Sequence, residues 1–260
     1  MLQGKNAVIT GSTSGIGLGI ATQLAKAGVN VVINSFTDRE DDYAIADKLA
    51  QDHKVKAAYF SADMSDADAC VALVEGATEK LGPISILVNN AGIQFVAPVE
   101  DFPPEKWDAI MAINLSSAFH TTRTAVPGMK AFGWGRIINI SSAHGLTASP
   151  FKSAYVAAKH GLVGFTKSVA LELAEQNITC NAVCPGYVMT PLVEAQIPDQ
   201  MKAHNMDRET VIREVMLDRQ PTREFATVEQ IGDIVAFLCS EAATQITGTP
   251  LSVDGGWTAL

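Results

Sequence analysis

A glycine-rich turn near the start of the chain limits its fold more than any other feature of the sequence. Ala7–Thr10 is a short apolar run, and Gly11–Gly17 follows it with glycines spaced as G-x-x-x-G-x-G. Ile16, Ile20 and Leu24 are then spaced by four, which is typical of one face of a helix. Glycines let the backbone turn tightly and approach a pyrophosphate, whose charge is favoured at a helix N-terminus. The segment therefore predicts a strand, a phosphate-binding turn and a helix.

Strand-like and helix-like segments alternate from one end of the sequence to the other. The predicted strands are Ala7–Thr10, Val29–Asn34, Val55–Phe60, Ile84–Val88, Arg136–Ile140, Ile178–Val183 and Pro250–Val253. The predicted helices begin with the Ile16 stripe and continue as Tyr43–His53, Ala67–Leu81, Glu105–Met129, Tyr155–Glu175 and Val228–Ser240. This alternation predicts an α/β fold, a doubly wound parallel sheet of the Rossmann type with helices on both faces. Because the sequence shows no linker or repeat, we expect residues 1–260 to form a single domain.

One long segment interrupts the alternation, because no strand pattern lies between Val183 and Val228. Pro191–Ile197 and Arg208–Leu217 look helical within it. A long insertion after the carboxyl end of a strand usually forms a lid or a wall of a substrate site. We expect residues 187–220 to be a helical substrate lid, and the alternative is a peripheral helix pair without a role.

Charge and cysteine content narrow the partners and the compartment. The net charge is −9, from 28 acidic and 19 basic side chains, so we expect no nucleic-acid partner. No apolar run is long enough to span a bilayer and no signal-peptide pattern opens the chain, so we expect no membrane partner. The four cysteines form no C-x-x-C pair, which favours buried reduced thiols, a cytoplasmic location and no metal site.

The end of the second predicted strand bears on the choice between NAD and NADP. There an acidic residue would bind the ribose 2′-hydroxyl, and a cation would bind a 2′-phosphate. Asn34 and Ser35 supply neither and the glycine turn has no cation, so we expect NAD, with Arg39 as the residue that could reverse this preference. Phe36 is either an adenine contact or ordinary packing. Asp63, which follows the third strand, would either bond the adenine amino group or cap the next helix.

Tyr155 and Lys159 stand four residues apart in a predicted helix and therefore share one face. A phenol with a pKa near ~10 is a poor base at neutral pH, but a neighbouring ammonium favours the phenolate. Ser142 ends the preceding strand and could hydrogen-bond an alcohol or carbonyl oxygen. Taken alone, this Tyr–Lys pair is also compatible with an ordinary exposed helix surface.

The sequence resembles the short-chain dehydrogenase/reductase family over essentially its whole length. The residues that carry the resemblance are Gly11, Gly15, Gly17, Asp63, Asn89-Asn90-Ala91-Gly92, Asn114, Ser142, Tyr155, Lys159, Pro185-Gly186 and Thr190. The resemblance implies that Tyr155 is the general base in alcohol oxidation, while Lys159 depresses its pKa and holds the nicotinamide ribose. It also implies that Ser142 orients the reacting oxygen, and that Asn114 interrupts its helix and holds a water in a proton relay.

The same resemblance implies sets of cofactor and substrate contacts. The expected cofactor contacts are Gly11, Thr13, Ser14, Gly15, Ile16, Gly17, Phe36, Asp63, Asn90, Ala91, Gly92, Tyr155, Lys159, Pro185, Gly186, Val188 and Thr190. Several segments resemble tetrameric family members that interconvert a four-carbon (R)-3-hydroxy acid and its 3-oxo acid. The expected substrate contacts are Gln94, Ser142, His144, Lys152, Tyr155, Tyr187, Gln196 and Trp257. Of these, Gln94, His144, Lys152 and Gln196 would bind the carboxylate, whereas Tyr187 and Phe95 replace a Trp and a His of those relatives.

Three other functions fit parts of the pattern. They are a 3-oxoacyl-carrier-protein reductase, a broad secondary-alcohol dehydrogenase and a non-catalytic dinucleotide sensor on the same fold. A carrier-protein reductase should use NADPH and present a basic docking surface, and the net charge of −9 counts against it. The complete set of Asn114, Ser142, Tyr155 and Lys159 counts against a sensor.

Overall fold

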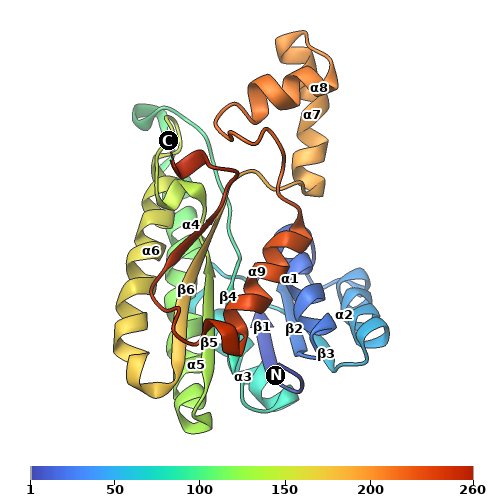
Figure 1. Ribbon diagram of the computed structural model, residues 1–260, viewed down its shortest axis with the longest axis vertical. Coiled ribbons are helices and arrows are strands. Elements are labelled where there is room, and N and C mark those ends of the chain that lie inside the picture. Colours follow the sequence, from blue (N-terminus) through green and yellow to red (C-terminus); the bar gives the residue numbers. More distant parts are fainter. Residues whose placement is uncertain (1, 260) are drawn as a thin grey trace.

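A seven-stranded parallel sheet forms the middle of the molecule in the computed structural model, which describes residues 2–259 (Figure 1). The strands are β1 (Asn6–Ile9), β2 (Asn30–Ser35), β3 (Ala57–Ser61), β4 (Ile86–Asn89), β5 (Gly135–Ile140), β6 (Ile178–Pro185) and β7 (Pro250–Val253). Their order across the sheet is β3-β2-β1-β4-β5-β6-β7, and every neighbouring pair is parallel. The order reverses between β1 and β4, which confirms the predicted doubly wound sheet and places ligand-binding loops at its carboxyl edge.

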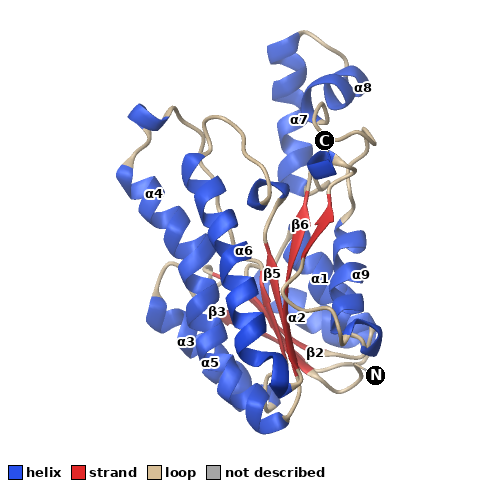
Figure 2. Cartoon of the chain, turned by 60° about the vertical axis from the view of Figure 1, so that its left-hand side comes forward, coloured by secondary structure: helices blue, strands red, loops and turns tan. Residues whose placement is uncertain are grey.

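Helices cover both faces of this sheet, as the alternation predicted (Figure 2). They are α1 (Gly15–Lys26), α2 (Glu40–His53), α3 (Ala67–Leu81), α4 (Pro104–Met111), α5 (Ser117–Phe132), α6 (Ser153–Leu173), α7 (Pro191–His204), α8 (Arg208–Val211) and α9 (Val228–Cys239). Helices α1, α2 and α9 bury Ile20, Leu49 and Val235 in one hydrophobic core. Helices α3, α5 and α6 form the other core around Leu73 and Met129. The apolar stripes read from the sequence are therefore the faces that pack on the sheet.

A π-helical turn over Ala112–Ser116 separates α4 from α5. The sequence predicted a single helix over Glu105–Met129 that is interrupted at Asn114, and the interruption is confirmed. A π-turn widens the helix locally and occurs frequently at functional sites. Here it turns the buried Asn114 towards the loop that follows β4.

Residues 187–220 form a helical body that rises beyond the carboxyl ends of the strands (Figure 1). It contains α7, α8 and a second π-turn over Ile212–Met216. Helix α7 extends to His204, well past the predicted end at Ile197, and ends where Asn205 adopts a left-handed backbone. Ile197 is buried in a cluster with Val211 and Met216. An isolated parallel β-bridge between Val188 and Ala226 joins the segment that enters this body to the segment that leaves it.

None of the helices among residues 2–259 combines the length and the apolar character that a membrane crossing needs. In the same part of the chain, no group of three or more His, Cys, Asp or Glu side chains is arranged to hold a metal ion. All four cysteines are free and buried, as predicted.

Candidate active site

The glycine turn lies at the carboxyl end of β1, clamped between β2 and β4. The Gly11 N–H donates to Asn34 Oδ1 at 3.1 Å, and Asn90 Nδ2 donates to the Gly11 carbonyl at 2.8 Å. Gly11 has a φ of +59°, and a Cβ on Gly17 would lie 2.3 Å from the Gly11 carbonyl oxygen. The side chain of the N-cap Ser14 bonds none of the first N–H groups of α1, which remain directed at an approaching anion. These features fit a dinucleotide pyrophosphate.

The stretch after β6 lies beside this turn. A Cβ on Gly15 would stand 3.5 Å from Thr190 Cγ2, so the cofactor candidates at the two loops are neighbours. Thr190 Oγ1 accepts a 3.3 Å hydrogen bond from Val193 N and begins α7. Gly186 N donates to the Val253 carbonyl at 3.0 Å, which fixes the strand end between Pro185 and the helical body. The root of that body is therefore attached to the cofactor end of the cleft.

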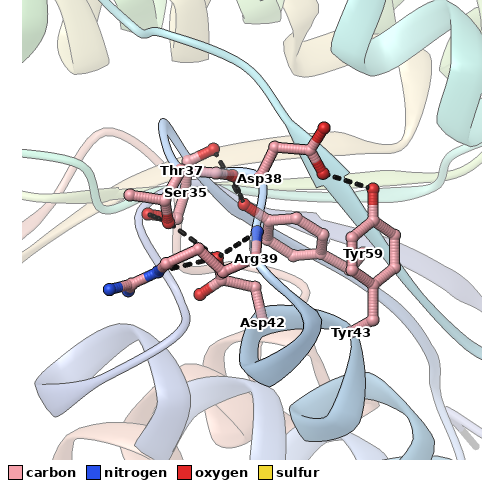
Figure 3. Close-up of polar contacts among 7 residues, drawn as sticks. All are labelled: Ser35, Thr37, Asp38, Arg39, Asp42, Tyr43 and Tyr59. Atoms are coloured by element: carbon pink, nitrogen blue, oxygen red, sulfur yellow. Dashed lines mark hydrogen bonds and ion pairs between the residues drawn. The ribbon is translucent and has the colours of Figure 1, made fainter.

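A polar network holds the loop after β2 (Figure 3). The buried Asp42 carboxylate accepts hydrogen bonds from Thr37 Oγ1 at 2.7 Å and from Arg39 N at 3.3 Å, with Arg39 Nε at 3.7 Å. These contacts, the Thr37 bond foremost, lower the pKa of Asp42, which is therefore ionised at neutral pH. Tyr59 donates its hydroxyl hydrogen to the Thr37 carbonyl from the opposite side. Arg39, the residue that could favour a 2′-phosphate, thus already contacts a carboxylate.

Phe36 and Asp63 flank the expected adenine position. Phe36 is 76% exposed, so packing against the core does not account for its place. Asp63 Oδ1 accepts 2.8 Å hydrogen bonds from the backbone and hydroxyl of Ser65. The prediction that Asp63 could cap the next helix is wrong, because Asp66 caps α3 through Asp68 N and Ala69 N. The Asp66 carboxylate lies one residue before the helix, where it reaches the free N–H groups.

Asn114, Ser142, Tyr155 and Lys159 come together at the carboxyl ends of β4 and β5. Asn114 bonds both the N–H and the carbonyl of Ile93, at 2.9 and 2.8 Å. A Cβ on Gly92 would stand 3.5 Å from Asn114 Oδ1 and 3.6 Å from Lys159 Nζ, so both polar groups face the same small space. The Lys159 ammonium lies 5.6 Å from the centroid of the Tyr155 ring. The four residues are thus one cluster, although three elements supply them.

Burial dominates the electrostatics of this cluster. It raises the pKa of Tyr155, and a hydrogen bond with Ser142 offsets only part of the rise. Burial also lowers the pKa of Lys159 to about 8. Burial is the largest cause of the rise in the Tyr155 pKa, and the expectation that Lys159 depresses this pKa stays a prediction.

Aromatic rings pack against one another next to Tyr155. The His144 ring lies edge-on to Tyr155 at 5.9 Å and to Trp257 at 5.1 Å, and Trp257 stacks on Tyr187 at 5.7 Å. His144 Nε2 bonds Ser149 Oγ at 2.9 Å. Four of the predicted substrate contacts, His144, Tyr155, Tyr187 and Trp257, therefore form a continuous row of packed rings.

A family model described as enoyl-(acyl carrier protein) reductase matches residues 11–258. The chain belongs to the short-chain dehydrogenase/reductase family. It is 56% identical to a D-beta-hydroxybutyrate dehydrogenase from Rhizobium meliloti over 98% of this chain and 99% of the relative. It is 53% identical to a second D-beta-hydroxybutyrate dehydrogenase, from Cupriavidus necator, over 100% of both chains.

The fold of this short-chain dehydrogenase/reductase matches that of a solved relative. L-sorbose reductase from Gluconobacter frateurii, complexed with NADPH and L-sorbose, superposes with a TM-score of 0.94 at 32% identity, covering 99% of this chain and 98% of the reductase. Binding of a nicotinamide dinucleotide therefore belongs to this fold, while the choice between NAD and NADP is not fixed by it.

The carboxylate contacts expected of this family member are only partly assembled. The Lys152 ammonium is half-buried and close enough to His144 to help lower the pKa of that imidazole to about 4, after burial itself. His144 is consequently neutral at pH 7 and able to donate or accept a hydrogen bond. Gln94 and Gln196 are exposed, and among residues 2–259 no hydrogen bond joins either of them to Lys152 or His144. Their convergence stays a prediction.

Arg219 is the charged residue at this cleft that sequence reasoning missed. Its Nη1 donates to the Ala148 carbonyl at 3.4 Å, and its charge acts on Lys152, His144 and Tyr187. No spacing or motif marks this arginine. The available signal was its place at the very end of the predicted lid segment, where a side chain can reach back over the cleft.

Proposed function

We propose that this dehydrogenase interconverts D-3-hydroxybutyrate and acetoacetate, with NAD as the electron acceptor. The observation that carries the proposal is the cationic side of the pocket beside Tyr155. Lys152 is partly buried there, and the charges that act on its pKa include Arg219 but no carboxylate. A partly buried ammonium without an acidic partner favours an anionic ligand, and a hydroxy acid supplies both that anion and an alcohol.

Four side chains share the proton transfer and the binding of the reacting oxygen. Tyr155 takes the proton of the substrate hydroxyl in oxidation and returns it in reduction. Ser142 holds the same oxygen, and the buried Lys159 supplies positive charge behind the phenol. A nicotinamide held by the glycine turn and the Thr190 loop would supply the hydride acceptor for the substrate carbon. Asn114, fixed by both Ile93 bonds, keeps its π-turn open beside Lys159, where a relay water would pass the proton outwards.

The preference for NAD rests on the loop after β2. The glycine turn carries no cation, and the Arg39 guanidinium faces the ionised Asp42. A 2′-phosphate would have to compete with that carboxylate for Arg39 and would also be repelled by it. We expect kcat/KM with NAD to exceed that with NADP by at least ~10-fold, or about 1.4 kcal/mol.

Substitution of Lys152 tests the substrate assignment. Lys152→Ala should lower kcat/KM for D-3-hydroxybutyrate by at least ~30-fold, because truncating one member of a desolvated charge pair is costly. The rate with 2-butanol, a neutral alcohol, should change little. Lys167→Ala, which removes an exposed lysine from α6, the helix that Lys152 precedes, is the control. Equal losses of kcat/KM with both alcohols in Lys152→Ala would refute carboxylate binding and favour a broad alcohol dehydrogenase. A wild-type protein that turns over neither alcohol would favour a non-catalytic sensor.

We also infer a homo-oligomer, in keeping with the tetramer expected from the family resemblance. We propose the long helices α5 and α6 as interface elements, because they expose large apolar side chains: Leu171 of α6 is 80% exposed and Phe119 of α5 is 47% exposed. A charged residue at either position should weaken self-association, and light scattering after gel filtration measures it. The four free thiols are the support for a reducing compartment, the cytoplasm.

A further inference from the structure

Arg219 sits where the helical body returns to the sheet. It follows the π-turn over Ile212–Met216 and precedes Gln220, which is buried. Gln220 Oε1 accepts a 3.0 Å hydrogen bond from the N–H of Tyr187, the residue that leaves β6 for the same body. The two roots of the body are thereby tied together, and Arg219 is held beside the packed aromatic rings.

The Arg219 side chain crosses from this root to the opposite side of the cleft. It donates a 3.4 Å hydrogen bond to the carbonyl of Ala148, which belongs to the loop before α6. That loop also provides Ser149, which bonds His144, and it leads into Lys152. The guanidinium therefore lies on the loop that holds the other polar groups of the substrate pocket.

The charges around this pocket do not cancel. Arg219 and Lys152 both disfavour protonation of His144, and Arg219 also lowers the pKa of Lys152. Neither cation belongs to an ion pair among residues 2–259, and the neighbouring Asp218 pairs with Arg223 instead. The exposed Arg219 guanidinium and the partly buried Lys152 ammonium repel one another, and a bound anion would relieve that repulsion.

We propose that Arg219 is a second cationic contact for the substrate carboxylate and a specificity-determining residue of this pocket. This inference rests on the proposed oxidation of a short hydroxy acid. An arginine presents two parallel N–H donors to a carboxylate, whereas Lys152 offers a point charge. The two cations together would select a negatively charged substrate and fix the orientation of its carboxylate. Because Arg219 belongs to the root of the helical body, the same contact favours closure of that body over an anionic substrate.

Three variants separate this role from a structural one. Arg219→Gln removes the charge but keeps a donor for Ala148, and Arg219→Lys restores the charge without the paired donors. Arg213→Gln is the matched control, because Arg213 lies in the same body, is 62% exposed and contacts only the exposed Glu214 as an ion pair. Thermal midpoints show whether each variant is folded.

We expect Arg219→Gln to lower kcat/KM for D-3-hydroxybutyrate by at least ~10-fold, mainly through KM, and to change kcat/KM for 2-butanol less than ~2-fold. Arg219→Lys should recover part of the loss, and Arg213→Gln should behave as wild type. An Arg219→Gln variant that keeps the wild-type preference for the acid would overturn the inference, as would equal losses with both alcohols. A wild-type enzyme without any preference for the acid would instead refute the proposed function.

Discussion

The Lys159 ammonium lies 5.6 Å from the centroid of the Tyr155 ring and donates a 2.8 Å hydrogen bond to the Ile140 carbonyl. Among residues 2–259 it is the single hydrogen bond that this buried ammonium makes. The ammonium that supports the catalytic phenol is therefore a buried charge whose desolvation is not fully offset by hydrogen bonds. Keeping it for catalysis lowers the free energy of unfolding.

Lys159→Met should raise the thermal midpoint at neutral pH and lower kcat by at least ~100-fold. Each kcal/mol gained raises the midpoint of a domain of this size by about 2–4 °C. Burial holds the pKa of Lys159 at about 8 in the folded protein, below the ordinary 10.5. Between these two values the unfolded state binds more protons, so wild-type stability should rise with pH across that window. Calorimetry should find this rise missing in Lys159→Met, and an equal rise in the variant would contradict the prediction.

Oxidation and reduction should respond to pH in opposite directions. Because burial raises the pKa of Tyr155, the phenol is mostly protonated at neutral pH. The initial rate of hydroxy acid oxidation should therefore climb towards alkaline pH, while that of oxo acid reduction should fall. Tyr155→Phe should lose ~10²- to 10⁴-fold in both directions and still bind the cofactor. Near-normal turnover in the folded variant would remove Tyr155 from the mechanism.

Asp42→Asn should relax the preference for NAD. The substitution retains an acceptor for Thr37 and Arg39 N but removes the charge that competes for the guanidinium. We expect kcat/KM with NADP, relative to NAD, to rise by about 10-fold, or 1.4 kcal/mol. Adding Arg39→Ala to this variant should cancel the gain, because the released guanidinium is its source. A ratio that stays unchanged in Asp42→Asn would place the selectivity elsewhere.

The helical body should exchange its amide hydrogens faster without ligand than with NAD and a substrate analogue. Its Ile197–Val211–Met216 cluster is separate from the two sheet cores, so the body can move without disturbing them. Hydrogen exchange should show added protection across residues 191–217, with α3 as the unaffected reference. Equal protection in both states would leave this segment as a fixed wall.

Local sequence patterns determined the fold because they depend on neighbours along the chain. The bounds of α3 and β7 agree at both ends with the prediction. An apolar period of 3.6 residues indicates the buried face of a helix, and a short apolar run indicates a buried strand. The glycine turn is equally local, because Gly11 needs a positive φ and Gly17 leaves no room for a Cβ. The resemblance then added the roles of Tyr155 and Lys159, which spacing alone left open.

Tertiary structure decided what depends on residues far apart in sequence. Burial by several elements raises the pKa of Tyr155, and no spacing along the chain reveals that burial. The guanidinium of Arg219 reaches Ala148 across 71 positions of the chain. Periodicity carries no information about such contacts, because they arise only when the chain closes the cleft and sets the desolvation and charge of each group.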